Sequence, residues 1–440
     1  MEIAMVVVFV LGYLSIALEH PLKVDKAASA LILGTVTWAL YTFSGADPHH
    51  VQEGLLHHLS EIAQILFFLM GAMTIVETVD SYHGFSIITK RITTTNKVKL
   101  LWIVSILTFF FSAVLDNLTT TIVMVSLLRK LIDDRETRLF YLGMVVVAAN
   151  AGGAWSPIGD VTTTMLWIGS QLTTTTIITQ LILPSMVTLL VPLIFLSFRL
   201  KGNLKRPELE DRDTGVISPK IQTLIFIMGV GGLLFVPVFK TVTHLPPFMG
   251  MMLSLGVLWL TTEIIVNKKK KVQETQSLLN INNVLQKIDV ASVLFFLGIL
   301  LGVAALQQAG FLDLVADYLR DTLGNIYTIN VAIGLISAVI DNVPLVAGAM
   351  GMYEITTPEM LQAASPENAE WLSFFVEDGR FWQFLAFCAG TGGSVLIIGS
   401  AAGVAAMGLE RIDFIWYLKN ISLLALMGYL GGAAFYVFVM

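Results

Sequence analysis

The stretch AVLDNLTTTIVMV, residues 113–125, places an aspartate and an asparagine, Asp116 and Asn117, between two apolar runs. The pattern returns far downstream as AVIDNVPLVAGAM, residues 338–350, with Asp341 and Asn342 at the corresponding positions. A charged side chain at the centre of a bilayer costs at least about 2.5–3.5 kcal/mol on insertion scales. Two Asp-Asn pairs inside apolar segments therefore indicate a function or a compensating partner.

The composition around these pairs is that of an integral membrane protein. Of the 440 residues, 55% are hydrophobic and only 13% are charged, whereas a soluble domain carries about a quarter charged residues. The single cysteine, Cys388, excludes an intrachain disulfide and a cysteine-rich metal site. The first apolar segment has no basic region before it and no clear cleavage site, so we interpret it as a retained span and not as a signal peptide.

The hydropathy pattern predicts an all-α polytopic membrane protein with ten spans, because several apolar segments have the length that a bilayer core requires. Between spans three and four, and between spans eight and nine, lie two hairpin-like segments at about 98–132 and about 326–354. The fourth and ninth spans are long and are interrupted by glycines. The ten spans cover residues 3–18, 27–44, 62–80, 140–169, 176–198, 221–239, 247–265, 289–307, 380–408 and 416–438.

The distribution of basic residues predicts the orientation of these spans. When the loops are assigned alternately to two sides, one side receives all but three of the 26 lysines and arginines, including the KKKK run at 268–271. The other side keeps Lys240, Arg320 and Arg380. Positive-inside bias places the first side in the cytoplasm, so both termini are expected outside the cytoplasm.

Three pairs of motifs repeat in the same order along the chain. ILFFLMG at 65–71 matches VLFFLGI at 293–299, FSAVLDN at 111–117 matches ISAVIDN at 336–342, and NAGGAWSPIGD at 150–160 matches GTGGSVLIIGS at 390–400. Each half holds five spans and one hairpin, and an odd number of spans turns the second half upside down in the membrane. Inverted-topology repeats are typical of transporters whose site lies near the midplane. We therefore expect a first repeat at 1–199, a cytoplasmic linker at 200–220 and a second repeat at 221–440.

Polar residues gather at the two Asp-Asn turns and in the two interrupted spans, which the repeat brings together. The candidate site residues are Asp116, Asn117, Thr119, Thr120, Thr121, Asn150, Ser156, Asp160, Thr162, Thr163, Thr164, Asp341, Asn342, Thr391, Ser394 and Ser400. Glycine pairs at 152–153 and 392–393 and Pro157 disfavour helix in mid-span. Opened backbone at membrane depth is tolerated only inside protein or along a watery cavity, where its carbonyls, together with amide and carboxylate oxygens, can bind a cation.

The aspartates suggest a competition between cations and protons. Low-dielectric surroundings favour the protonated form of a carboxylate, and a neighbouring carboxylate favours it further. Sodium entering such a site favours the ionised form and expels protons. No lysine or arginine lies inside the core of an assigned span, so the sequence indicates no salt-bridge partner for these aspartates.

Simpler roles remain open for several of these residues. Each aspartate can act as a helix cap, and Glu77 and Asp80 are expected at the membrane interface. His49, His50, His57 and His58 are expected in a solvated extracytoplasmic loop, with metal binding or pH sensing as alternatives. The TTTT run at 173–176 is expected to cap a helix. No role is derived for the acidic segment 354–380.

With these motifs in place, the chain resembles the NhaD-type sodium/proton antiporters of the ion transporter superfamily, along essentially its whole length. The resemblance implies a homodimer in the bacterial inner membrane, with two re-entrant hairpins that meet unwound helices and with elevator-like alternating access. It implies no enzyme activity, no cofactor and no nucleic-acid partner. It also implies a site lined by Asp116, Asn117, Asn150, Asp160, Thr162, Thr163, Asp341 and Asn342, joined by Ser394 and Ser400, with sodium or lithium at Asp116, Asn117, Asn150 and Asp160.

An anion transporter of the same superfamily, for dicarboxylates or arsenite, is the alternative. The dicarboxylate branch resembles this layout but carries a neutral Ser-Asn-Thr at the hairpin turn, whereas aspartate precedes asparagine in both turns here. An anion site with extra carboxylates and no basic partner is disfavoured. The sequence therefore favours export of sodium in exchange for protons.

Overall fold

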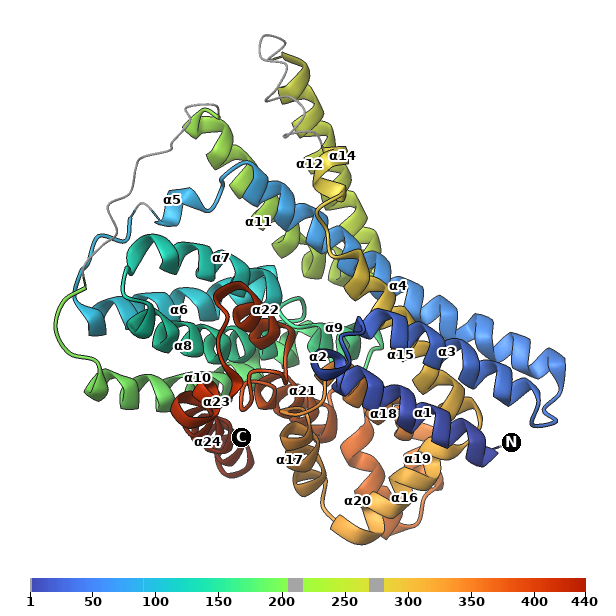
Figure 1. The fold of residues 1–440 in the computed structure, drawn as a ribbon. Helices are drawn as coiled ribbons and strands as arrows, with labels where there is room; N and C mark the ends of the chain where they lie inside the picture. The colour runs from blue at the N-terminus through green and yellow to red at the C-terminus, as the bar shows by residue number, and fades with distance from the viewer. Residues whose placement is uncertain (1, 90, 205–216, 269–280) are drawn as a thin grey trace.

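The computed structural model describes residues 2–89, 91–204, 217–268 and 281–440, and this part of the chain is almost entirely helical (Figure 1). Its ordered elements include no β-sheet, and seven of its helices are long and apolar enough to cross a membrane. The predicted class of all-α multi-span membrane protein is therefore confirmed. Most of the predicted linker, at 205–216, and Lys269, Lys270 and Lys271 of the KKKK run lie outside the described residues.

Each predicted span of the first half coincides with a helix or a helix pair, although α4 begins well before the span predicted there. They are α1 (Glu2–Ala17), α2 (Glu19–Leu22), α3 (Lys26–Thr42), α4 (Pro48–Ser81), α5 (Ser86–Thr89), α6 (Lys97–Leu115), α7 (Asn117–Leu131), α8 (Arg135–Ala154), α9 (Val161–Ile168) and α10 (Thr174–Arg199). The predicted hairpin is thus the pair α6–α7, which meet at Asp116, and the predicted broken span is the pair α8–α9.

The second half repeats this order. Its helices are α11 (Pro219–Thr243), α12 (Pro247–Lys268), α14 (Ile281–Leu285), α15 (Val290–Gln308), α16 (Phe311–Leu323), α17 (Ile326–Ile336), α18 (Asn342–Met352), α19 (Pro358–Ala363), α20 (Pro366–Leu372), α21 (Arg380–Gly392), α22 (Ala401–Glu410), α23 (Phe414–Tyr417) and α24 (Leu423–Val439), with a 3-10 turn at Ser373–Phe375 and a π-helical turn at Leu418–Ser422. Here α17–α18 form the hairpin and α21–α22 the broken span.

The helices form two groups that face each other (Figure 1). Helix α3 packs against α1 and α15, and α4 packs against α12 and α15. We call α3, α4 and α15 the wall helices. The hairpins pack on the broken spans, α6 on α8 and α17 on α21, and the two sets join through the pairs α7–α22 and α9–α18. We call these eight helices the bundle.

The two hairpins contact their broken spans in the same way. A Cβ atom added to Gly152 would lie 2.2 Å from the carbonyl oxygen of Phe109, and one added to Gly392 would lie 2.1 Å from that of Gly334. Both glycines are therefore required by close backbone approach. The spacing of 225 residues between the hairpin partners matches that of the two Asp-Asn pairs.

A serine bond accompanies each glycine contact. The Ser112 hydroxyl donates to the Ala149 carbonyl at 2.5 Å, and the Ser337 hydroxyl donates to the Ala389 carbonyl at 3.0 Å. The repeated motifs thus make the same contacts at matching positions in the two halves.

The expected histidine loop is helical instead. Helix α4 begins at Pro48, with the Asp47 carboxylate accepting a bond from the His50 amide, and it contains all four histidines. Contacts between histidine and glutamate side chains at helical spacing, His49 with Glu53 and His57 with Glu61, run along its exposed face. These polar residues lower the local hydropathy, which made the predicted span begin too late, at residue 62.

Other regions left open by the sequence become defined. Thr173 caps α10 through the Thr176 amide, as expected for the TTTT run. The acidic segment 354–380 folds into short helices, and the Asp378 carboxylate accepts bonds from the amide and hydroxyl of Thr173 at 2.7 and 2.8 Å. The segment therefore ties α10 to α21.

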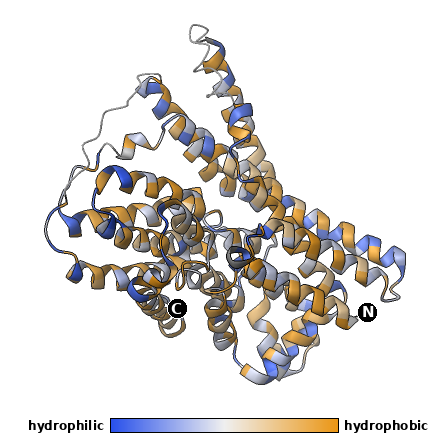
Figure 2. Ribbon diagram, viewed as in Figure 1, coloured by the Kyte–Doolittle hydropathy of each residue, from blue (hydrophilic) through white to orange (hydrophobic). Residues whose placement is uncertain are grey.

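The outer surface is apolar, as a lipid-facing surface requires. Figure 2 shows hydrophobic residues covering the outward helices, and large apolar side chains such as Val7 on α1, Ile227 on α11, Leu260 on α12 and Leu423 on α24 are exposed. Exposed patches of this extent on a water-soluble protein would promote association.

Candidate functional site

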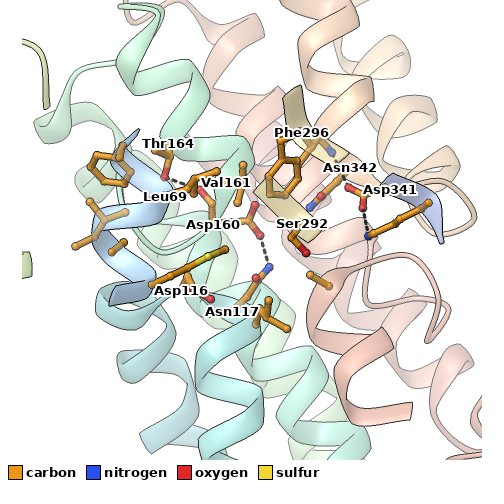
Figure 3. Close-up of a pocket in the computed structure, with 18 residues that line it drawn as sticks. Leu69, Asp116, Asn117, Asp160, Val161, Thr164, Ser292, Phe296, Asp341 and Asn342 are labelled. Carbon is orange, nitrogen blue, oxygen red and sulfur yellow. Dashed lines mark hydrogen bonds and ion pairs between the residues drawn. The ribbon is translucent and has the colours of Figure 1, made fainter. Parts of the chain in front are cut away.

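A cavity of about 50 Å³ lies where the hairpin tips and helix breaks face the wall helices (Figure 3). The bundle contributes Asp116, Asn117, Leu118, Ile158, Asp160, Val161, Thr164, Asp341, Asn342, Val343 and Ala401, and the wall contributes Lys26, Phe68, Leu69, Ala72, Met73, Ser292 and Phe296. The polar residues of both halves thus meet here. Phe68 and Phe296 come from the repeated LFFL motifs. The sequence repeat alone did not show that these motifs contribute to the site.

Asp160 is the most buried carboxylate of the site. It caps α9 just after the chain interruption and is 1% exposed. One carboxylate oxygen accepts bonds from the amide and hydroxyl of Thr162 at 2.9 and 2.6 Å, and the other accepts a bond from Asn117 Nδ2 at 2.6 Å. Asp160 is therefore both a helix cap and a charged group held among polar side chains.

The two asparagines connect three elements around Asp160. Asn117 Nδ2 also donates to Asn150 Oδ1 at 3.1 Å, and Asn150 Nδ2 donates to Ser400 Oγ at 2.9 Å. Ser400 in turn caps α22 by accepting a bond from the Gly403 amide. The tip of the first hairpin and both helix breaks therefore share one buried polar network, which is favourable only while its members are satisfied.

Asp116 has an unusual backbone. Its φ is 75° and its ψ is 163°, a combination that is essentially restricted to glycine and costs about 1–3 kcal/mol in other residues. Its carboxylate accepts bonds from the amide and hydroxyl of Thr119, both at 2.8 Å. The equivalent Asp341 has φ −48° and caps α18 without this strain. The tips therefore differ although their sequences match.

Asp341 has a basic partner that the sequence did not indicate. Lys26 Nζ lies 3.3 Å from Asp341 Oδ2, with the two side chains 23% and 18% exposed. The expectation that no lysine or arginine pairs with an intramembrane aspartate is therefore wrong. Lys26 belongs to the first turn of α3, beyond the core of its span, and 315 residues separate it from Asp341. Helix α15, which packs against both α3 and α18, connects the two elements that carry them.

The remaining predicted residues divide into two kinds. Thr163 Oγ1 and Asn342 Nδ2 are buried and have no hydrogen-bond partner within the described ranges, and of the two residues only Asn342 lines the cavity. Ser394 is buried, but its hydroxyl donates to the Thr391 carbonyl within the same turn and it does not line the cavity. Ser394 therefore supports the helix break and is not brought to the site.

The described residues contain no cluster of three or more His, Cys, Asp or Glu side chains suited to a resident metal ion. A cation in the cavity would instead use the carboxylates together with amide and hydroxyl oxygens, which are hard ligands that suit alkali and alkaline-earth ions. This set of ligands suits a weakly bound, exchangeable cation better than a tightly bound metal ion.

A larger cavity adjoins the site on one side of the molecule. A cavity of about 450 Å³ shares Lys26 and Asp341 with it and extends past Glu19, Met407 and Phe414. This is the side to which the basic-residue count assigns the cytoplasm.

The opposite side is separated by an apolar layer. Another cavity, of about 310 Å³, continues along α4, α9, α15 and α18 and contains His58, Glu61 and Gln307, but shares no lining residue with the site. Phe68 and Phe296 line the site at this end, and Met165 lines the far cavity. The two cavities are therefore separate in this conformation.

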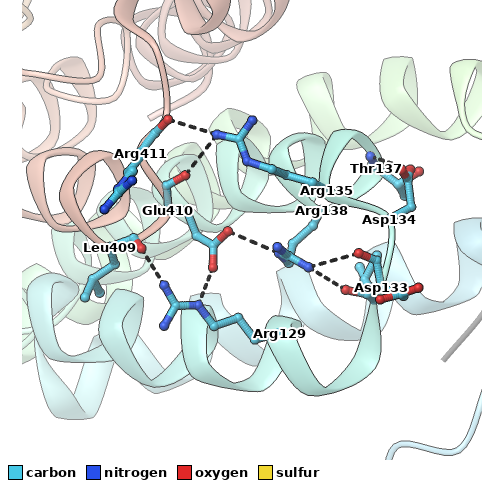
Figure 4. Close-up of polar contacts among 10 residues, drawn as sticks. Arg129, Asp133, Asp134, Arg135, Thr137, Arg138, Leu409, Glu410 and Arg411 are labelled. Carbon is cyan, nitrogen blue, oxygen red and sulfur yellow. Dashed lines mark hydrogen bonds and ion pairs between the residues drawn. The ribbon is translucent and has the colours of Figure 1, made fainter. Parts of the chain in front are cut away.

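The far end of α22 is held by arginines (Figure 4). The side chain of Glu410 is 5% exposed and is paired with Arg129 of α7 and with Arg138 of α8, the latter at 3.2 Å. Arg129 and Arg135 also donate to the carbonyls of residues 409–411. Cations at a helix C-terminus interact favourably with its dipole, so this cluster fixes the helix that Ser400 begins.

Comparison with known proteins gives consistent matches along the chain. A family model described as "Citrate transporter" matches residues 2–376. "Sodium/proton antiporter 1" of Arabidopsis thaliana is 46% identical over 438 residues, covering all of this chain and 72% of the relative. "Sodium/proton antiporter 2" of the same plant is 43% identical over 99% of both chains. "Na(+)/H(+) antiporter NhaD" of Alkalimonas amylolytica is 30% identical over 94% of this chain and 86% of the relative.

Proposed function

The chain belongs to the citrate transporter family of the ion transporter superfamily, and on that premise we propose that it is a sodium/proton antiporter. It is a transport protein and not an enzyme. Among the relatives, those named as sodium/proton antiporters resemble it along almost its entire length. Lithium, as a close surrogate of sodium, is proposed as a second substrate.

The observation that carries the proposal is the buried network of Asp160, Asn117 and Asn150, in which Asp160 and Asn117 line one cavity together with Asp116. Sodium would be bound by oxygens of these four residues. Within the described residues, both carboxylates accept hydrogen bonds from amide or hydroxyl groups, and neither forms an ion pair with a lysine or an arginine. Charge balance at this place must then come from protons or from a bound cation.

Exchange is possible because either sodium or protons can neutralise the negative charge of the same carboxylates. When sodium binds, the ionised forms of Asp116 and Asp160 are favoured and protons leave. When sodium leaves on the other side, protons return to the carboxylates and the cycle resets. The proton gradient would drive the export of sodium, and Thr162 would hold the Asp160 carboxylate oriented in both loading states.

The cavities support alternating access. The site shares lining residues with a cavity on the proposed cytoplasmic side and shares none with the cavity on the other side, toward which Phe68 and Phe296 would form the closure. We propose that the bundle moves against the wall helices in an elevator-like manner, with hairpins α6–α7 and α17–α18 re-entrant. The matched contacts of Gly152 and Gly392 support an inverted repeat with halves at 1–199 and 221–440.

The protein is proposed to lie in a bacterial inner membrane as a homodimer with extracytoplasmic termini. The basic-residue count supports extracytoplasmic termini, and the bacterial relatives support a bacterial inner membrane. A homodimer is proposed from the family resemblance. No cofactor or nucleic acid takes part in the proposed cycle.

Anion transport is the second candidate, because the family description names citrate and because Lys26 lines the cavity. However, Lys26 is paired with Asp341, and Asp116 and Asp160 line the same cavity. One lysine against three aspartates leaves the cavity with excess acidic groups, which favours a cation.

The deciding experiment measures proton movement in vesicles that contain the purified protein. A pH gradient is imposed, and NaCl, LiCl, KCl or citrate is then added at external pH values from mildly acidic to alkaline. We expect sodium and lithium, but not potassium or citrate, to collapse the gradient. The absence of a sodium response at every pH would contradict the proposal, and a citrate response would support the second candidate.

Asp160→Asn is the matched site variant, since asparagine is also a good helix cap and removes only the charge. It should abolish exchange without unfolding the protein. Asp134→Asn is the control, because Asp134 caps α8 through the Thr137 amide in the same manner at an exposed position. Normal exchange by Asp160→Asn would remove Asp160 from the site.

A further inference from the structure

We propose that Lys26 is a fixed counter-ion on the wall that pairs with Asp341, withholds this carboxylate from sodium, and so sets how tightly the site binds its cation. The inference rests on the proposed function, since it concerns the affinity of the same site. It identifies Lys26 as a positioning and specificity-determining residue that does not itself touch the transported ion.

The geometry of Lys26 supports a fixed position. Its Nζ atom lies 3.3 Å from Asp341 Oδ2 and 4.5 Å from the centre of the Phe295 ring. A cation over an aromatic face is attracted by the ring quadrupole. The ammonium is therefore held from two directions, by a carboxylate of the bundle and by an aromatic ring of wall helix α15.

Asp341 is also restrained on its other oxygen. Asp341 Oδ1 accepts a bond from the Val343 amide at 3.1 Å, which caps α18. With Oδ2 directed to Lys26, neither oxygen is left without a donor. Asp116 and Asp160 differ from Asp341, because they accept hydrogen bonds from threonine hydroxyls, the Asn117 amide group and backbone amides, which carry no net charge. The three aspartates of the cavity are therefore not equivalent.

The location of the Lys26–Asp341 pair affects cations that approach the site from the adjoining cavity. Lys26 and Asp341 line both the site and the adjoining 450 Å³ cavity. A cation that approaches from this side meets the neutralised Asp341 first and the uncompensated Asp116 and Asp160 farther in. The pairing therefore directs sodium to the first-repeat side of the site.

The ion pair also joins the two helix groups. Lys26 belongs to wall helix α3, whereas Asp341 belongs to the hairpin α17–α18 of the bundle. Any movement of the bundle along the wall changes the distance between them. The counter-charge then acts in the conformation described here and is withdrawn when the bundle moves.

The test is a double-mutant cycle of Lys26→Gln, Asp341→Asn and the combined variant, with initial exchange rates measured against sodium concentration. Lys26→Gln leaves the Asp341 carboxylate without its counter-ion. We expect the half-saturating sodium concentration to fall roughly tenfold, which is the usual effect of one nearby unit charge on an ionisable site. Asp341→Asn leaves an unpaired ammonium and should raise it roughly tenfold or more. The combined variant should return close to wild type.

Recovery in the combined variant separates the proposal from its alternatives. If Asp341 binds sodium directly or carries the exchanged proton, exchange stays lost in both Asp341 variants, and the proposal is overturned. Unchanged half-saturation in Lys26→Gln also overturns it. Wild-type vesicles that do not exchange sodium at all would contradict the proposed function itself, and the two failures are therefore distinguishable.

A chemical rescue tests charge apart from shape. In Lys26→Cys, reaction with 2-aminoethyl methanethiosulfonate restores an ammonium, whereas methyl methanethiosulfonate adds a neutral group. We expect only the charged reagent to raise the half-saturating sodium concentration back toward wild type, and equal effects of both reagents would overturn the proposal. The one native cysteine, Cys388, is fully buried, so treated wild type serves as the background control. Lys23→Cys, at an exposed lysine three residues away, is the matched control for reagent access.

Discussion

Asn117 Nδ2 lies 2.6 Å from Asp160 Oδ2, although 43 residues separate the two in the chain. One side chain is at the tip of the first hairpin and the other caps α9 after the helix break. The hydrogen bond therefore connects two interruptions of helical structure, and through Asn150 it extends to a third at Ser400. The site is built from helix ends, where backbone groups are left free.

Removal of the Asn117 amide should weaken sodium binding. In Asn117→Ala, Asp160 and Asn150 each lose a donor, and a hydrogen bond to a charged group is worth about 1.5–3 kcal/mol, so half-saturation should rise at least roughly tenfold. Exchange rates against sodium concentration measure this. Asn96→Ala, which removes a cap at an exposed helix start, is the control. Wild-type half-saturation in Asn117→Ala would show that the amide does not organise the site.

Glycine at position 116 should separate strain from function. Asp116→Gly and Asp116→Ala both lose the carboxylate and should lose exchange. Because φ is 75° at this position, the glycine variant should be more stable than the alanine variant by about 1–3 kcal/mol. Unfolding in detergent measures the difference. At Asp341, where φ is −48°, the order of the two variants should reverse, and equal stabilities at position 116 would contradict the strained backbone.

Alanine at Gly152 should disturb the hairpin. Its Cβ would lie 2.2 Å from the Phe109 carbonyl, so the backbones must separate. Overpacking of this kind costs about 1–3 kcal/mol, and the shift should also displace Asn150 and slow exchange. Melting temperature and exchange rate are the measurements. Gly231→Ala is the control, because a Cβ there meets nothing within 4 Å. Equal behaviour of the two variants would argue against the close approach.

Neutralisation of Glu410 should destabilise the protein. In Glu410→Gln, Arg129 and Arg138 lose a charged partner, and the cost should be roughly 1–3 kcal/mol. Thermal unfolding checks this. Glu53→Gln should have almost no effect, because its pairing with His49 is fully at the surface, where such pairs contribute little. A Glu410→Gln protein as stable as wild type would mean that α22 is anchored by the carbonyl contacts alone.

The dependence of sodium binding on pH should count the displaced protons. Sodium binds the ionised carboxylates, so half-saturation should fall as pH rises, by roughly tenfold per pH unit for each proton displaced. In Asp160→Asn, half-saturation should depend less steeply on pH, by the equivalent of one displaced proton, wherever residual sodium binding is measurable. A pH-independent affinity in wild type would contradict competition between sodium and protons.

Much of the architecture could be predicted because its signals are local. Apolar length predicts spans, Gly152-Gly153 and Pro157 predict a helix break, and an aspartate after such a break predicts a cap. Of the predicted cluster, Asp116, Asn117 and Asp160 line one cavity in the structure, and Asn150 is hydrogen-bonded to Asn117 beside it. Ser394 belonged to the same pattern but bonds within its own turn, because a serine hydroxyl readily finds a local carbonyl.

The sequence by itself determined that this is a helical membrane protein with paired hairpins and paired helix breaks, since hydropathy, glycine, proline and capping residues act over a few neighbouring positions. The tertiary structure alone decided which distant side chains meet. It placed Lys26 against Asp341, and it brought Phe68 and Phe296 into the lining of the site, beside a larger cavity that shares Lys26 and Asp341. Such contacts depend on how packed helices are rotated and shifted, and no local pattern carries that information across 315 residues.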